Sequence, residues 1–213
     1  MKLRDGVQYI GSPFVIPDCS RDDLPEFFKQ LGFKTGAEIG VYKGEYTRQL
    51  AKAGLGVYAI DAWAPYEDFD RLEDARIERQ EELYQRAKKK FEPYNSITII
   101  RKKSMDALKD FEDESLDFVY IDANHRLKFA VEDIYEWAKK VRKGGIVAGH
   151  DYIHFEEYPR KEQTWAKLLM HARYAVDAYV RSYRIKSWYL LGRETKIKGE
   201  KRDRCRSWMW FKE

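Results

Sequence analysis

Short apolar runs alternate with amphipathic segments through most of the chain, and no other feature limits the fold as much. The runs that we predict to be strands are 37–41, 56–61, 97–100, 116–122 and 146–151. They are apolar almost throughout, as is typical of strands buried on both faces. The pattern at 126–141 has apolar residues every three or four positions, which predicts a helix. This order predicts an α/β fold, a Rossmann-like doubly wound sheet that is mostly parallel and has helices on both faces.

The two ends of the chain extend this pattern without forming a second unit. The length suits a single domain spanning 1–213. We expect a helical lead-in at 1–35, in which Ser20 and Asp23 form a capping box. A C-terminal β-hairpin is predicted at 184–213, on the edge of the sheet.

Three further segments carry expectations about helices. The stretch 63–91 is long and highly charged, with a thin apolar face. It is either a lid over a site or a surface helix, and its charge favours the surface helix. Another helix is expected around 164–182, and the paired glycines at 144–145 should end the helix at 126–141.

Composition indicates a protein with neither a disulfide framework nor a membrane segment. Cys19 and Cys205 form no metal-binding spacing and suit a reducing compartment. No run approaches the roughly 18 apolar residues of a membrane span, and the N-terminus does not read as a signal peptide. We therefore expect a cytoplasmic location. Charged residues make up 36% of the chain, a composition typical of thermophilic proteins.

Positive charge is concentrated near the C-terminus. The net charge is only +4, too small to indicate a nucleic-acid partner. Residues 181–213, however, hold eleven Lys and Arg against four Asp and Glu. This segment favours an anionic substrate, unless it is simply a solvated charged hairpin.

The stretch GAEIGVYKGEYT joins a predicted strand to a helix through two glycines. Gly40 and Gly44 permit positive φ and close approach of a ligand to the backbone. Asp61 ends the next strand, where a carboxylate can bind both hydroxyls of a ribose. The spacing departs from the G-x-G-x-x-G of dinucleotide sites, and Glu38 and Glu45 would repel a pyrophosphate. The carboxylates suit a ligand with an ammonium and a sulfonium, which indicates S-adenosylmethionine.

Four motifs together resemble the class I S-adenosylmethionine-dependent methyltransferases. They are AEIGVYKGEYTRQL, YAIDAW, SLDFVYIDANHR and VRKGGIVAGHDY, which cover about residues 36–152. The resemblance is strongest to the small-molecule O-methyltransferase-like branch, which carries an IDxxH…GGxxxxHDY signature. It implies a seven-stranded sheet with an antiparallel last strand, and methyl transfer to a small-molecule acceptor.

The resemblance also implies roles in binding the cofactor. It places the methionine part near the glycine loop, the ribose at Asp61 and the adenine beside Ser104 and Met105. Trp63 directly follows the strand end and is expected to pack against the adenine. The full set of predicted cofactor contacts is Glu38, Gly40, Tyr42, Gly44, Asp61, Ala62, Trp63, Ser104, Met105 and Asp122.

The stretch DFVYIDANHR ends an apolar run in a cluster of polar side chains, as expected of a strand that delivers groups to a site. A neutral hydroxyl is a poor nucleophile, so O-methylation needs a base or a metal. Histidine is the side chain that ordinarily titrates closest to neutral pH. His125 is therefore the candidate general base, with Asp122 as a second catalytic residue. The alternative is that His125 only caps the following helix.

Asp122, His150 and Asp151 are a candidate metal site, because neighbouring strand ends would bring them together. In related metal-dependent O-methyltransferases these positions hold oxygen ligands for Mg²⁺. The nitrogen of His150 shifts the preference toward Mn²⁺, Fe²⁺ or Zn²⁺, or toward no metal at all. Otherwise Asp122 holds the ammonium of the cofactor while His150 and Asp151 orient the acceptor. The competing functions are a nicotinamide-dependent oxidoreductase and a non-catalytic cofactor-binding interaction protein.

Overall fold

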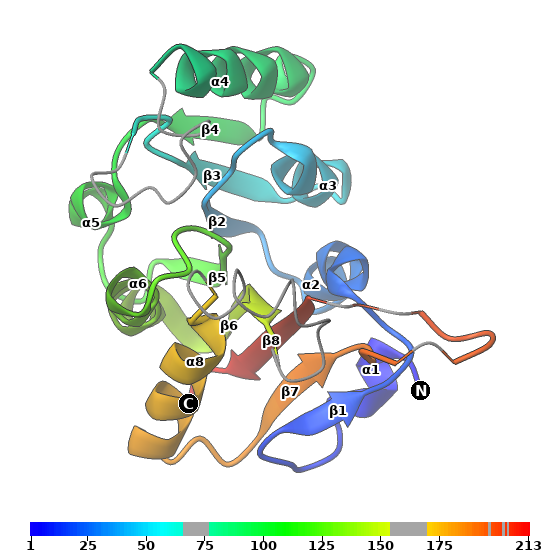
Figure 1. Cartoon of the computed structure of the whole chain (residues 1–213). Helices are drawn as coiled ribbons and strands as arrows, with labels where there is room; N and C mark the ends of the chain where they lie inside the picture. Colours follow the sequence, from blue (N-terminus) through cyan, green and yellow to red (C-terminus); the bar gives the residue numbers. More distant parts are fainter. Residues whose placement is uncertain (66–76, 154–169, 196, 202, 204) are drawn as a thin grey trace, which may run out of the picture.

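The computed structural model describes residues 1–65, 77–153, 170–195, 197–201, 203 and 205–213. They form one eight-stranded sheet in the order β1-β7-β8-β6-β5-β2-β3-β4 (Figure 1). The strands are β1 (Phe14–Ile16), β2 (Thr35–Ile39), β3 (Gly56–Ile60), β4 (Ile97–Ile100), β5 (Leu116–Ile121), β6 (Val141–Tyr152), β7 (Trp188–Leu191) and β8 (Arg206–Phe211). The helical segments are α1 (Leu3–Gly6), η1 (Arg21–Asp23), α2 (Leu24–Gln30), α3 (Glu45–Lys52), α4 (Ile77–Phe91), α5 (Ser104–Ala107), η2 (Leu108–Asp110), α6 (Leu127–Lys140) and α8 (Ala172–Ser182).

The pairing of the strands confirms a mostly parallel sheet. Strand β8 runs antiparallel to both of its neighbours, β6 and β7, and every other pairing is parallel. Two details differ from the expectation. The predicted helical lead-in also contributes a strand, β1, which raises the number from seven to eight, and β1 rather than the hairpin forms that edge. The run FVI is too short to stand out as a strand, and it is ordered here by pairing with β7.

Helices cover both faces of the sheet, and this explains why the strand sequences are apolar at nearly every position. In β5, Val119 and Ile121 pack into the cluster under α6 and α8, whereas Phe118 and Tyr120 pack toward α2 and α3. Alternate residues thus point to opposite faces, and each face is buried. A third cluster fills the space between α4 and strands β3 and β4.

The paired glycines do not end the preceding helix. Helix α6 ends at Lys140 and strand β6 begins at the next residue. Gly144 (φ +74°) and Gly145 lie within β6, where its pairing with β5 shifts register. The two glycines lie at an irregularity of strand β6, where Gly144 adopts a left-handed conformation. The capping box predicted for Ser20 is confirmed, at the start of η1.

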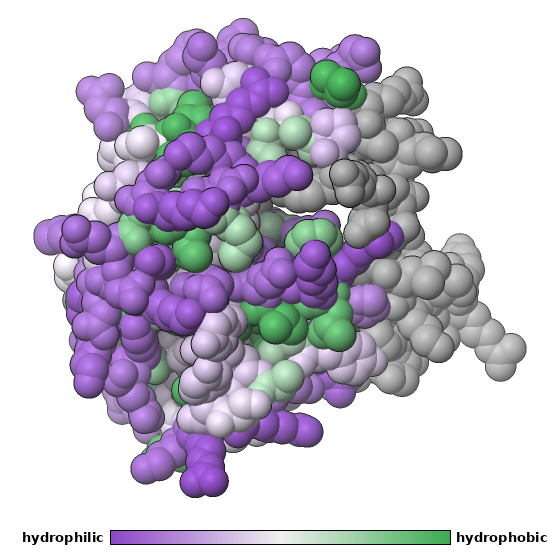
Figure 2. Space-filling model, turned by 90° about the vertical axis from the view of Figure 1, so that its left-hand side faces the viewer, coloured by the Kyte–Doolittle hydropathy of each residue, from purple (hydrophilic) through white to green (hydrophobic). Residues whose placement is uncertain are grey.

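The remaining expectations about helices concern segments that are only partly described. Two segments lie outside the described residues, 66–76 and 154–169. The first belongs to the stretch 63–91, predicted as a lid or a surface helix. Within the described part, α4 packs its apolar side against the third cluster. No described helix is both long enough and apolar enough to cross a membrane. The face seen in Figure 2 is mostly hydrophilic, with hydrophobic side chains in separate patches.

Candidate active site

The loop after β2 packs against the end of β5, and this contact requires glycine at position 40. Gly40 has φ +90°, and a Cβ atom there would lie 2.2 Å from the carbonyl oxygen of Asp122. Gly44 has φ +73°, and a Cβ atom there would lie 2.5 Å from the ring of Phe91 in α4. The two glycines therefore have different structural reasons. Gly40 joins the loop to the neighbouring strand end, and Gly44 lets α4 approach the start of α3.

Asp61 fixes this loop through backbone hydrogen bonds. Its Oδ2 accepts from the N–H groups of Val41 (3.0 Å) and Tyr42 (2.9 Å), and its Oδ1 accepts from the N–H of Trp63 (2.8 Å). Burial raises the pKa of Asp61, although these hydrogen bonds oppose the shift. A carboxylate offers about four acceptor sites, so accepting capacity remains for a ribose hydroxyl. The ribose contact of Asp61 stays a prediction.

Trp63 lies beneath α4 rather than at the surface. Its side chain is buried, its Nε1 donates to the carbonyl of Tyr42 (2.9 Å), and its ring centroid lies 5.1 Å from that of Tyr84. These contacts hold the ring of Trp63 within the fold, and its expected packing against adenine stays a prediction. Trp63 also anchors the loop that carries Tyr42, whose own side chain is exposed. Ala62 is buried beside it.

Glu38 is buried and accepts a hydrogen bond from the hydroxyl of Thr47 in α3. Burial raises its pKa to about 8, despite the opposing hydrogen bond. Glu45, by contrast, is exposed and paired with Lys90 of α4. Only Glu38 therefore lies inside the fold beneath the glycine loop, and the charge of Glu45 is already compensated.

Ser104 belongs to a buried polar group between α5 and α6. Its hydroxyl donates to Asp133 and accepts from Nε1 of Trp137 (2.8 Å). Burial raises the pKa of Asp133 to about 7. The side chain of Ser104 is thus committed to α6, and Met105 packs partly buried against the same core. The adenine contacts of Ser104 and Met105 stay predictions.

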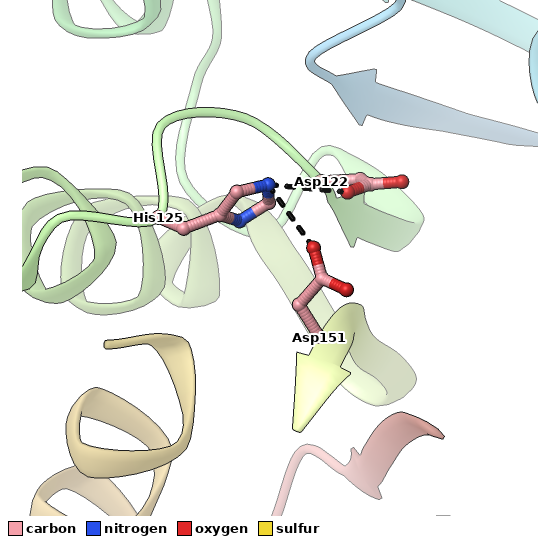
Figure 3. Close-up of side chains that lie close together, drawn as sticks. All are labelled: Asp122, His125 and Asp151. Carbon is pink, nitrogen blue, oxygen red and sulfur yellow. Dashed lines mark ion pairs between the residues drawn. The ribbon is translucent and has the colours of Figure 1, made fainter. Parts of the chain in front are cut away.

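The polar residues after β5 and at the end of β6 meet at one point (Figure 3). Nε2 of His125 lies 3.1 Å from Oδ2 of Asp151 and 3.9 Å from Oδ1 of Asp122. Nδ1 of His150 lies 3.2 Å from Oδ1 of Asp151 and 3.9 Å from Oδ2 of Asp122. Asp151 thus stands between two imidazoles, which confirms that these strand ends bring the predicted residues together.

Neighbouring groups shift the ionisation of Asp151 and of His150. Burial alone would raise the pKa of Asp151, but the charges of His125 and His150 and the hydrogen bond from His150 bring it below its ordinary value. Burial also opposes a charge on His150, yet its hydrogen bond to Asp151 and the charges of Asp122 and Asp151 raise its pKa. At neutral pH Asp151 is therefore a carboxylate.

A backbone irregularity in β6 places these side chains. The pairing of β6 with β8 shifts register between Gly149 and Tyr152, and Asp151 has φ +59°. An extra residue of this kind bends the strand and re-aims the side chains beside it. His150 and Asp151 therefore meet directly, which a regular strand with alternating side chains would prevent.

The candidate metal ligands differ from the predicted set. Among the described residues, Asp122, His125 and Asp151 have ligand atoms that all lie within 4.8 Å of one another. His125 takes the place predicted for His150. Because His125 is also the candidate base, it cannot bind a metal and accept a proton through the same nitrogen.

Arg21 is a residue of this site that the sequence did not reveal. Its Nη1 donates to Oδ2 of Asp122 at 3.1 Å, across 101 residues of sequence. Its guanidinium carbon lies 5.4 Å from the ring centroid of Tyr46, whose hydroxyl donates to the carbonyl of Arg21 at 3.1 Å. No local pattern distinguishes Arg21 from other charged residues near a helix start, so only the packing of η1 against the sheet identifies it.

Comparisons with known proteins agree with this architecture. Residues 37–152 match the model of a family described as a methyltransferase domain, which is more than half of the chain. A comparison with curated proteins found no match.

Solved structures of similar fold include methyltransferases with different acceptor atoms. The O-methyltransferase from Bacillus cereus, in complex with S-adenosylhomocysteine (SAH), is 14% identical, with 90% of this chain and 80% of that chain covered and a TM-score of 0.58. TomG from Streptomyces achromogenes, an O-methyltransferase involved in tomaymycin synthesis and solved with S-adenosylmethionine (SAM), is 13% identical, with 91% and 80% covered and a TM-score of 0.58. The N-methyltransferase NodS from Bradyrhizobium japonicum is 14% identical, with 90% and 94% covered and a TM-score of 0.56. At these identities the likeness establishes the fold alone. The match over residues 37–152 goes further: this chain belongs to the methyltransferase domain family.

Proposed function

We propose that this chain is a SAM-dependent methyltransferase that acts on a small molecule, at a hydroxyl oxygen. The observation that carries the proposal is the close approach of Gly40 to the main chain of Asp122. It brings the glycine loop after β2 next to the polar cluster, at the carboxyl ends of neighbouring strands. Membership of the methyltransferase family supports the activity. Neighbours of the same fold solved with SAH or SAM support the cofactor.

The residues present suit this cofactor. Glu38 and Asp122 are carboxyl groups next to the loop and would face the ammonium, and Asp61 retains accepting capacity for the ribose. SAM supplies, when bound, a methyl group on a sulfonium sulfur. Gly40 would let the backbone of the loop approach its methionine part closely.

The polar cluster would remove the proton from the acceptor hydroxyl. SAM would supply the methyl group that the acceptor oxygen takes, leaving SAH, and His125 would take the hydroxyl proton. Since Nε2 faces Asp151, the receiving atom is Nδ1, and the carboxylate of Asp151 stabilises the imidazolium that forms. An anionic acceptor would suit the basic C-terminal segment and the raised pKa of His150.

Two measurements test this proposal. In a thermal shift assay, SAH at ~100 times its Kd should raise the Tm by about 5–10 °C, and NAD⁺ should not. Methyl-labelled SAM should then label alcohols or phenols in a panel of small molecules that also contains amines. A shift with NAD⁺ alone would disprove the cofactor, and labelling of amines alone would disprove the hydroxyl acceptor.

A further inference from the structure

We infer that the guanidinium of Arg21 takes the place of a divalent cation at Asp122, so that methyl transfer here needs no metal. The claim about the reaction rests on the proposed function, whereas the claim about cation binding does not. Arg21 would act as a positioning residue, because its side chain reaches the reaction only through Asp122.

Two kinds of cation could neutralise Asp122, a bound metal ion or the guanidinium of Arg21. Asp122, His125 and Asp151 have ligand atoms within 4.8 Å of one another, so distance alone would admit a metal ion. The guanidinium of Arg21, however, is bonded to Asp122 at 3.1 Å. A metal bound to Asp122 would lie next to a group that cannot lose its charge. A dication at Asp122 would meet about twice the repulsion from this guanidinium that a singly charged ammonium would meet, and the charge of the site therefore disfavours the metal.

Each carboxylate of the cluster already has a close partner among the described residues. Asp122 is paired with Arg21, and Asp151 is paired with His125 and His150 at 3.1 and 3.2 Å. A dication bound to Asp122 and Asp151 would therefore compete with Arg21 and His150 for these carboxylates, even with His125 as a ligand.

Arg21 is held in place independently of Asp122. The hydroxyl of Tyr46 donates to its carbonyl, and the ring of Tyr46 lies beside its guanidinium, a favourable cation–π arrangement. The capping box of Ser20 shapes the turn, and Asp23 is bonded to Lys201 at 2.7 Å. The cation is therefore built into the fold rather than carried on a loose surface side chain.

Arg21 also determines which carboxylate is the closer partner of His125. With Oδ2 of Asp122 bonded to the guanidinium, Asp122 stays 3.9 Å from Nε2 of His125. Asp151, at 3.1 Å, is then the closer partner. Arg21 lies before the family match at 37–152, so the match itself does not cover this cation.

Binding of Mn²⁺ to the full chain, measured by calorimetry and electron paramagnetic resonance, tests the inference. The wild type should bind Mn²⁺ weakly, and Arg21→Ala and the longer neutral Arg21→Met should bind it at least tenfold more tightly. Arg21→Lys, which keeps the charge, should resemble the wild type, as should Arg4→Ala, which removes an exposed charge elsewhere. Adding Asp122→Asn to Arg21→Ala should abolish the gain.

Two outcomes would overturn the inference. One is tight binding of one Mn²⁺ by the wild type that Asp122→Asn removes, and the other is no gain in either neutral variant. Once an acceptor is known, turnover by the wild type should resist EDTA, and Arg21→Lys should retain more kcat than Arg21→Ala. A thermal shift with SAH on every protein checks folding and separates the two proposals. If the wild type fails to bind SAH, the proposed function is wrong. The Mn²⁺ comparison would still test whether Arg21 keeps a metal ion away from Asp122.

Discussion

Nε2 of His125 lies 3.1 Å from Oδ2 of Asp151, whose other oxygen lies 3.2 Å from Nδ1 of His150. His125 follows strand β5, whereas His150 lies near the end of strand β6. Their shared carboxylate is buried and has a lowered pKa, because the charges of the histidines outweigh the effect of burial. Asp151 can therefore orient His125 and stabilise its charged form, which is what a general base needs during proton transfer.

Replacing Asp151 with Asn should lower kcat by about 10²–10⁴-fold, because the imidazolium would lose its carboxylate. The affinity for SAH should change little, since no cofactor contact is proposed for Asp151. Steady-state kinetics and calorimetry measure the two quantities. Asp177→Asn is the matched control, because Asp177 in α8 is bonded to Tyr152 and not to a histidine. An equal loss of SAH affinity and kcat would assign Asp151 to the cofactor instead.

Gly40→Ala should be more damaging than Gly54→Ala, although both glycines have φ +90°. At Gly54 nothing lies within 4 Å of the added Cβ, so the cost is the left-handed conformation alone, about 1–2 kcal/mol. At Gly40 the Cβ would overlap the carbonyl of Asp122, adding roughly 1–3 kcal/mol and displacing the cofactor loop. Urea unfolding and SAH binding of both variants check this. Equal losses would show that the contact with β5 is unimportant.

Asp61→Asn should destabilise the protein even without a cofactor. An amide has one oxygen, so it cannot accept all three backbone hydrogen bonds, and a loss of roughly 1–3 kcal/mol is expected. Urea unfolding without ligand measures it, with the exposed, Lys102-paired Asp110→Asn as control. Unchanged stability with a lost affinity for SAH would give Asp61 a purely ligand-binding role.

Glu38 should make the protein less stable as the pH rises. Its carboxyl ionises near pH 4.5 in the unfolded chain, whereas burial raises the pKa to about 8 in the folded protein. Between these values the folded state keeps a proton that the unfolded state has released. The free energy of unfolding therefore falls as the pH rises, by at most ~1.4 kcal/mol per pH unit.

Glu38→Gln cannot ionise and should remove this contribution. Its stability relative to the wild type should increase between pH 5.5 and pH 8, as measured by urea unfolding at several pH values. Glu45→Gln is the control, because pairing with Lys90 lowers the pKa of Glu45. Its effect should be constant over the same range. A constant difference for Glu38→Gln as well would mean that Glu38 is ionised throughout.

The packing partners of Trp63 and Ser104 show where sequence reasoning reaches its limit. Each follows a strand end that was correctly placed near the site, and position in the chain does indicate that much. Whether the side chain then turns toward a ligand or into the core depends on neighbours from α4 and α6. Those neighbours are Tyr84 for Trp63, and Asp133 and Trp137 for Ser104.

By itself, the sequence determined the class of fold, the central strands and the group of polar residues at their ends. These features are local, because the spacing of apolar residues and the point at which an apolar run stops are written in consecutive residues. Only the tertiary structure decided that β1 completes the sheet, that His125 rather than His150 joins the possible metal ligands, and that Arg21 reaches Asp122. Each of these depends on which side chains approach across the folded chain, and 101 residues separate Arg21 from Asp122. Such contacts follow from packing and charge in three dimensions, which local periodicity does not encode.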